Sequence, residues 1–217
     1  MQPILIIVLA TAAGVLLGRW LRHNLATLGY RNADEANRPE PGPRRWVVWT
    51  SVIVFANLAG AAALSHDPLA YLPLVPLAAT GPWLAAVDFD VLRIPNRVLA
   101  PTAAATLLAV VGTTVATRDW MALIVPTAAA LATGGVFSAV HFSTEGGIGF
   151  GDVKLATVIG LAVGSLGVTA TWVSVLAGSL TALVWAKASR SKGPIPYAPW
   201  LLCGAWSALL AGIALRV

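Results

Sequence analysis

Long uncharged stretches alternate with short polar segments along the whole chain. Most of these stretches approach about 20 residues, which is the length that a helix needs to cross the hydrocarbon core of a bilayer. The stretch at 155–186 is too long for one crossing, and Gly160, Gly164 and Gly167 within it favour two shorter helices. The pattern therefore predicts eight transmembrane helices. They are expected at about 2–19, 46–64, 69–88, 98–117, 120–141, 152–165, 167–186 and 198–215.

The composition agrees with this pattern. Hydrophobic residues make up 58% of the chain and charged residues 11%, and the mean hydropathy is +0.79. These values are typical of an all-α polytopic membrane protein rather than of a globular domain in water. We expect a single domain over 1–217. The polar, proline-rich segment at 20–45 is predicted to be a short flexible loop within it.

The basic residues predict the orientation in the membrane. Cytoplasmic loops of membrane proteins are enriched in Lys and Arg. If the basic segments of this chain follow that rule, four of them face the cytoplasm: 22–45, 93–97, 141–154 and 187–192. Every Lys and Arg except Arg118 and Arg216 lies on or next to that side, which puts both termini outside. The net charge of +5 follows from this topology, so we expect no nucleic-acid partner.

Three carboxylates lie at the cytoplasmic edge of the predicted helices: Asp88, Asp90 and Asp152. Carboxylates at such positions are costly, so a function is the default hypothesis. Asp152 directly precedes an apolar run and can alternatively cap a helix. Asp88 ends a helix, Pro95 then breaks the chain direction, and Asn96 can cap the next helix.

Glycines surround Asp152. Gly146, Gly147, Gly149 and Gly151 precede it within six positions. Glycine permits a positive φ and lets another chain approach closely, which suits a carboxylate that meets a substrate backbone. A flexible turn explains the same glycines without any function.

Aspartyl hydrolysis requires two carboxylates beside one water molecule. They share a proton, so that the ionised partner activates the water and the protonated partner polarises the scissile carbonyl. One alternative is a proton- or cation-coupled transporter that uses the same two carboxylates, although its acids are expected nearer the middle of the bilayer. A membrane scaffold in which both acids cap helices is another.

Three segments together resemble a known family. "DFDVLRIPN" (88–96), "GFGDVKLA" (149–156) and "IPYAPWLLCGA" (195–205) are similar to motifs of the type IV prepilin peptidases and preflagellin peptidases, which are G-x-G-D aspartyl proteases. The presenilin-like proteases, which share G-x-G-D, fit less well. The family's first catalytic aspartate stands seven positions before the proline, which selects Asp88 over Asp90, and the second is Asp152.

The resemblance implies an enzyme that removes a short basic leader from prepilin or pilin-like precursors at the cytoplasmic face of the inner or plasma membrane. Its partners would be these precursors and membrane lipid, and the sequence indicates no oligomeric state. Lys154 and Arg93 would favour ionised carboxylates or hold the substrate, although both also fit as basic anchors at helix ends. The expected supporting residues are Gly149, Gly151, Lys154, Arg93, Pro95 and Asn96.

The chain departs from the family in one respect. Many bacterial members carry two CxxC pairs in a long first cytoplasmic loop and also N-methylate the new pilin terminus. Here Cys203, in the last predicted helix, is the sole cysteine. We therefore expect no metal and no cofactor, and nothing in the residues supports methyltransferase activity.

Overall fold

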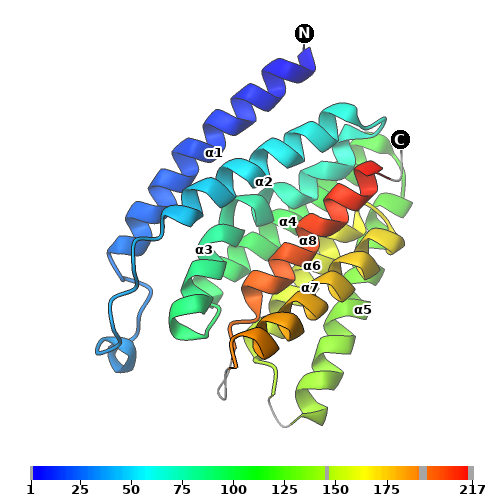
Figure 1. The fold of residues 1–217 in the computed structure, drawn as a ribbon. Coiled ribbons are helices and arrows are strands. Elements are labelled where there is room, and N and C mark those ends of the chain that lie inside the picture. Colours follow the sequence, from blue (N-terminus) through cyan, green and yellow to red (C-terminus); the bar gives the residue numbers. More distant parts are fainter. Residues whose placement is uncertain (1, 145–146, 191–194, 215–217) are drawn as a thin grey trace.

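The computed structural model describes residues 2–144, 147–190 and 195–214, and these residues form helices and no strand (Figure 1). Each predicted segment contains one helix, which confirms the all-helical class. The α-helices are α1 (Gln2–Ala26), α2 (Arg45–Leu64), α3 (Val75–Val91), α4 (Asn96–Thr117), α5 (Met121–Ser143), α6 (Phe150–Gly164), α7 (Val168–Ala188) and α8 (Ala198–Ala214). Two short 3₁₀ helices, η1 (Ala33–Glu35) and η2 (Pro68–Leu74), precede α2 and α3.

Several helices have the length and apolar character of membrane spans. Six segments within the described residues qualify: α1, α2, α4, α5, α7, and η2 continued by α3. The chain is therefore a helical polytopic membrane protein. Helices α6, with 15 residues, and α8, with 17, are apolar but shorter.

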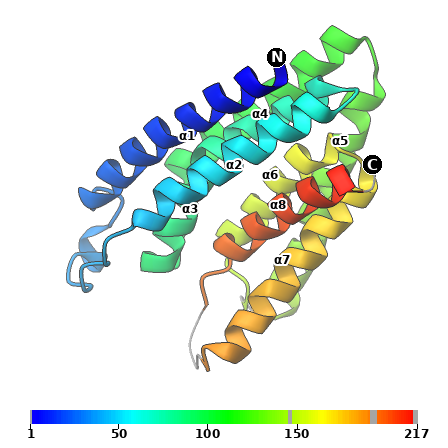
Figure 2. The ribbon, with the colours of Figure 1, turned by 45° about the horizontal axis from the view of Figure 1, so that its top comes forward.

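Close helix pairs form the framework of the bundle, namely α1 with α2, α5 with α6, and α7 with α8 (Figures 1 and 2). Glycines permit this approach. A Cβ atom on Gly160 of α6 would lie only 2.8 Å from the Ala129 carbonyl oxygen of α5, and one on Gly204 of α8 would lie 2.5 Å from the Gly178 nitrogen of α7. Small residues at helix contacts are the usual means of close packing in lipid.

The segment Pro68–Val91, formed by η2 and α3, is the most enclosed of the six candidate spans. Of its most apolar window, 67% of the residues are buried inside the protein, against 17–33% for the other five. Helix α3 supplies most of this segment. It contacts α1, α2, α4 and α8. It ends where Leu92 takes a left-handed conformation, with φ 54°, and donates its N–H to the Asp88 carbonyl oxygen at 3.0 Å.

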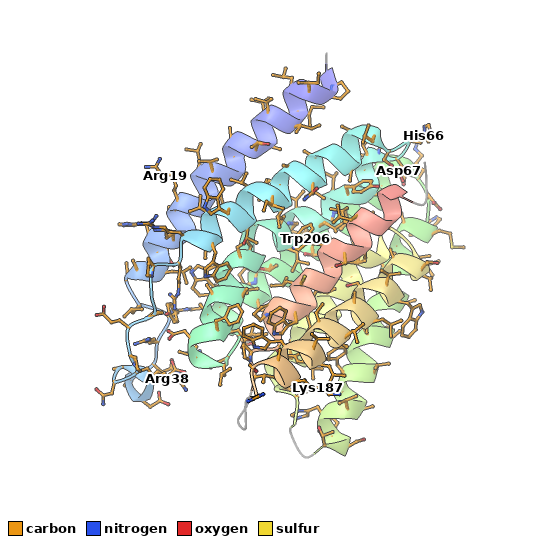
Figure 3. All side chains as sticks on the ribbon, in the orientation of Figure 1. Arg19, Arg38, His66, Asp67, Lys187 and Trp206 are labelled. Carbon is orange, nitrogen blue, oxygen red and sulfur yellow. The ribbon has the colours of Figure 1, made fainter. Side chains whose placement is uncertain are left out.

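The ends of the helices place the two aspartate motifs together. In Figure 1 the end of α3, the start of α6 and the start of α8 lie at one end of the bundle, whereas α1 begins and α8 finishes at the opposite end. Figure 3 shows Arg38 and Lys187 at the first end, with His66 and Asp67 at the other. Asp88 and Asp152 thus share one end of the molecule, which is also rich in basic residues.

Two predictions about connections have different outcomes. The turn expected between Gly164 and Gly167 is confirmed: α6 ends at Gly164, Gly167 has φ 107°, and α7 begins at Val168. The segment 20–45 contains the end of α1, which continues to Ala26, and the turn η1, whereas its flexibility stays a prediction. Its hydrogen bonds to α3 are described below.

Candidate functional site

Asp88 lies in the last turn of α3 and is 3% exposed. Its Oδ2 accepts the backbone N–H of Ala198 at 2.9 Å. Ala198 is the first residue of α8, and the first N–H groups of a helix have no partner inside that helix. The carboxylate satisfies such a group, and the positive end of the α8 dipole favours its negative charge. Asp88 therefore caps α8, a helix that begins 110 residues later in the chain.

Asp152 is the third residue of α6, after the N-cap residue Gly149. Its own N–H donates to the Gly149 carbonyl oxygen at 2.9 Å, and its Oδ2 lies against Gly149. Its Oδ1 is buried and has no hydrogen-bond partner among the described residues. Gly151, next to Asp152, packs against Ile94 in the turn that follows α3, so the segments that carry Asp152 and Asp88 are in contact. Only the Oδ2 side of Asp152 has the character of a helix cap.

The glycines beside Asp152 provide space rather than unusual backbone angles. A Cβ atom on Gly149 would lie 3.1 Å from the Asp152 Oδ2, and one on Gly151 would lie 3.2 Å from the Ile94 Cβ. The expected positive φ is wrong for Gly147, Gly149 and Gly151, since Gly167 alone among the described glycines has one. Gly146 lies outside the described residues. Close approach is thus the reason for both glycines of G-x-G-D.

Pro95 and Asn96 begin α4 next to this site. Pro95 is the N-cap residue, and its carbonyl oxygen accepts the N–H groups of Val98 and Leu99, each at 3.1 Å. The prediction that Asn96 caps α4 is wrong, because Asn96 is already the first helical residue. Its Oδ1 instead accepts a hydrogen bond from the Lys154 Nζ at 3.1 Å. Asn96 therefore joins α4 to α6.

The two basic residues expected beside the carboxylates have other partners. Lys154 binds Asn96, and its ammonium group lies 5.1 Å from the centre of the Phe150 ring. Arg93 donates to Glu35 at 3.1 and 2.8 Å and to the Tyr30 carbonyl oxygen at 3.1 Å. Lys154 thus connects the two motif segments, and Arg93 connects the turn after α3 to the polar loop after α1.

Two groups at the site were missed by sequence reasoning. The Ala198 amide belongs to the proline-aromatic-small-proline segment, but its bond to Asp88 depends on tertiary placement. His141 Nδ1 lies 2.6 Å from the Ile148 carbonyl oxygen, and its ring centre lies 5.6 Å from that of Phe150. Since a carbonyl only accepts, Nδ1 carries the hydrogen. His141 thereby holds the segment that leads into Gly149.

The chemistry available here is that of a carboxylate pair. Two neighbouring carboxylates in a partly buried site ionise together only at a high cost, so one proton is readily shared between them. The described part of the chain has no group of three or more His, Cys, Asp or Glu side chains placed to hold a metal ion.

Comparison with known proteins identifies the family. The family model of the type IV leader peptidase family matches residues 77–187, which is about half of the chain. No curated protein and no solved structure gives a significant match. The matched range includes Asp88, the Ile-Pro-Asn turn and Asp152, and it ends before the start of α8. The chain therefore belongs to the type IV leader peptidase family, a family of proteases.

Proposed function

We propose that the protein is a membrane aspartyl endopeptidase that removes the short basic leader from prepilin or pilin-like precursors, with Asp88 and Asp152 as its catalytic pair. One observation carries the proposal. Two carboxylates lie on helix ends that are in contact at one end of the bundle: Asp88 is bound to the Ala198 amide, and Asp152 has a buried oxygen without a partner among the described residues. The family supports the leader-peptidase activity.

The two carboxylates have different surroundings, and these favour different roles. Asp88 accepts an N–H group at the positive end of α8, which stabilises its ionised form. Because two ionised neighbours repel each other, the shared proton then resides on Asp152. Asp88 takes a proton from the attacking water, while Asp152 donates a hydrogen bond to the scissile carbonyl oxygen as negative charge develops there.

The proposed topology has eight spans, with both termini outside and the carboxylates at the cytoplasmic face of the cell's inner or plasma membrane. Helices α6 and α8, about 22 and 25 Å long at 1.5 Å per residue, would cross beside their longer partners α5 and α7. Local thinning of the bilayer accommodates such short helices. The basic residues near the carboxylates, among them Arg93, Lys154 and Lys187, support this orientation.

The remaining site residues act in this proposal as supports for the pair. Gly149 leaves room for the Asp152 carboxylate, and Gly151 lets α6 approach the turn before Pro95. Asn96 and Lys154 join α4 to α6, while Arg93 fixes the α1 side of the site. The hydrophobic helix of a precursor would lie in lipid beside the protein, with its leader reaching the carboxylates from the cytoplasm.

The direct test is cleavage of a precursor that carries a lysine-rich leader before a hydrophobic helix, by purified protein in detergent. We expect Asp88→Asn and Asp152→Asn each to lower turnover by about 10²- to 10⁴-fold, the usual contribution of an acid or base. Asparagine keeps an oxygen that can accept the Ala198 N–H, so this change separates chemistry from capping. Asp67→Asn, an exposed carboxylate at the opposite end, is the matched control.

Equal cleavage by all four proteins would refute the catalytic pair. If none cleaves the precursor, while ion flux into proteoliposomes depends on Asp88 and Asp152, the transporter replaces the peptidase. If none cleaves the precursor and neither substitution affects ion flux, the remaining explanation is a membrane scaffold in which both acids cap helices.

A further inference from the structure

The polar loop between α1 and α2, residues 27–44, is fastened to the end of α3 through Asp90. The Arg31 guanidinium binds this carboxylate with two parallel hydrogen bonds, from Nε to Oδ2 at 2.9 Å and from Nη2 to Oδ1 at 2.8 Å. The Tyr30 hydroxyl also donates to Oδ2. Arg44 donates to the Tyr30 hydroxyl oxygen at 2.7 Å and lies 3.4 Å from Asp90 Oδ2.

The charged side chains of this cluster are mostly covered by the protein. The exposed fractions are 5% for the Arg31 side chain, 8% for Asp90 and 9% for Arg44. Paired hydrogen bonds between Arg and a carboxylate are strong and directional. Removing one partner of a buried pair is costly, because the other charge is left unpaired. Asp90 is therefore a fixed attachment point rather than a solvated surface residue.

The same loop also caps the last turn of α3. The final carbonyl groups of a helix have no partner inside it. Arg38 of the loop donates to the backbone carbonyl oxygen of Asp90 at 2.6 Å, and Arg31 donates to the carbonyl oxygens of Arg38 and Pro39 at 2.9 and 2.8 Å. The loop is thereby held to itself and to the turn that carries Asp88.

The loop and the candidate pair lie on different sides of α3. Ala86, Phe89 and Asp90 line one cavity of about 670 Å³ together with loop residues 38–44. A helix turns about 100° per residue, so Asp88 points about 200° away from Asp90, toward α8. The loop therefore packs against one side of the last turn of α3, and Asp88 lies on the other side of that turn.

We propose that Asp90 is a positioning residue, which acts through Arg31 and Tyr30 to hold the α1–α2 loop on α3 and so to fix Asp88 against Asp152. This role rests on the proposed peptidase function. Asp90 touches neither the substrate nor the water in this proposal. Its loss releases the loop, loosens the last turn of α3 and lowers turnover, while binding of the precursor elsewhere on the protein is largely kept.

The experiment measures two properties of purified protein in detergent: the kcat and KM of precursor cleavage, and the rate of tryptic cleavage after Arg31. We expect Asp90→Asn to lower kcat by about ten- to a hundredfold, since small misplacements of catalytic groups have effects of this size, with KM changing much less. Tryptic cleavage after Arg31 should accelerate by a similar factor. Asp90→Glu, which keeps the carboxylate, should restore both properties in part.

Two further variants keep the test decisive. Tyr30→Phe removes only the hydroxyl that joins Asp90 to Arg44, and it should produce smaller changes in the same direction even if Asp90→Asn fails to fold. Glu40→Gln, an exposed carboxylate of the same loop, is the control and should change neither property.

The outcomes separate this inference from the proposed function. If the wild type cleaves the precursor, and Asp90→Asn and Tyr30→Phe release the loop without lowering kcat, the positioning role is overturned and the peptidase stands. Unchanged tryptic cleavage in both variants overturns the attachment itself. A wild type that cleaves no precursor overturns the peptidase and the positioning role together, and the tryptic rates still decide the attachment.

Discussion

A Cβ atom on Gly151 would lie 3.2 Å from the Cβ of Ile94 and 3.5 Å from its backbone nitrogen. The second glycine of G-x-G-D is therefore in contact with the Ile-Pro-Asn turn that follows α3. The two segments that carry Asp88 and Asp152 are thus held together at a point where only a glycine fits without displacement. Their relative position depends on the absence of one methyl group.

Gly151→Ala tests this contact. The added methyl group pushes α6 and the turn apart by a few tenths of an ångström, and insertions of this kind cost about 1–3 kcal/mol. We expect turnover of the precursor to fall by about tenfold or more. The helical content, measured by circular dichroism, should stay the same. Gly112→Ala is the control, because nothing lies within 4 Å of the added atom, and it should retain full turnover. Equal turnover of the two variants would contradict the prediction.

Ala198→Pro tests the hydrogen bond from α8 to Asp88. Proline lacks the N–H group but is tolerated at the first position of a helix, so the change removes the donor with little effect on α8 itself. We expect at least a tenfold loss of turnover, because the Asp88 carboxylate loses the amide that holds it. Ala198→Val adds the same number of carbon atoms and keeps the N–H. If both variants lose the same activity, crowding at this buried position is the cause.

Glu35 provides a pH-dependent test of loop attachment. The hydrogen bond from Arg93 holds the pKa of Glu35 below its ordinary value of about 4.5. Because the folded pKa is depressed, this contact stabilises the attached loop fully above the ordinary pKa, and the stabilisation is lost as the pH falls through the folded value. We therefore expect the loop to become more mobile only below about pH 4.5.

A nitroxide label on Ala36→Cys, in a Cys203→Ser background, reports this mobility by electron paramagnetic resonance. Both positions are exposed. Glu35→Gln should give a more mobile label near neutral pH and a smaller change on acidification. A label whose mobility is the same in both proteins at every pH would refute the role of Glu35.

Much of the fold was predictable because lipid imposes a simple requirement on helices. The uncharged stretches correspond to the eight α-helices of the described residues, within a few residues at most ends, and the turn at Gly167 was predicted correctly. The main exception is α1, which continues past Arg19 to Ala26. A charge indicates where a helix leaves the hydrocarbon core, and this need not be where the helix ends.

The site was predictable only in part. Motif order and sidedness indicated that Asp88 and Asp152 lie at the same end of the bundle. The partners of Arg93 were not predictable. Glu35 lies 58 residues earlier, and several other carboxylates of the chain also lie in polar segments of the sequence. The Ala198 amide was missed for a related reason: every helix start offers free N–H groups, and tertiary packing alone decides which of them meets a side chain.

The division into three close helix pairs has a consequence for the whole molecule. Asp88 belongs to α3, Asp152 to the α5–α6 pair and Ala198 to the α7–α8 pair, so no single unit contains the complete arrangement. Helices of unequal length adjust to bilayer thickness by tilting, so we expect the tilt of one pair relative to another to depend partly on the surrounding lipid. We therefore expect the thickness of the host membrane to influence the distance between the two carboxylates.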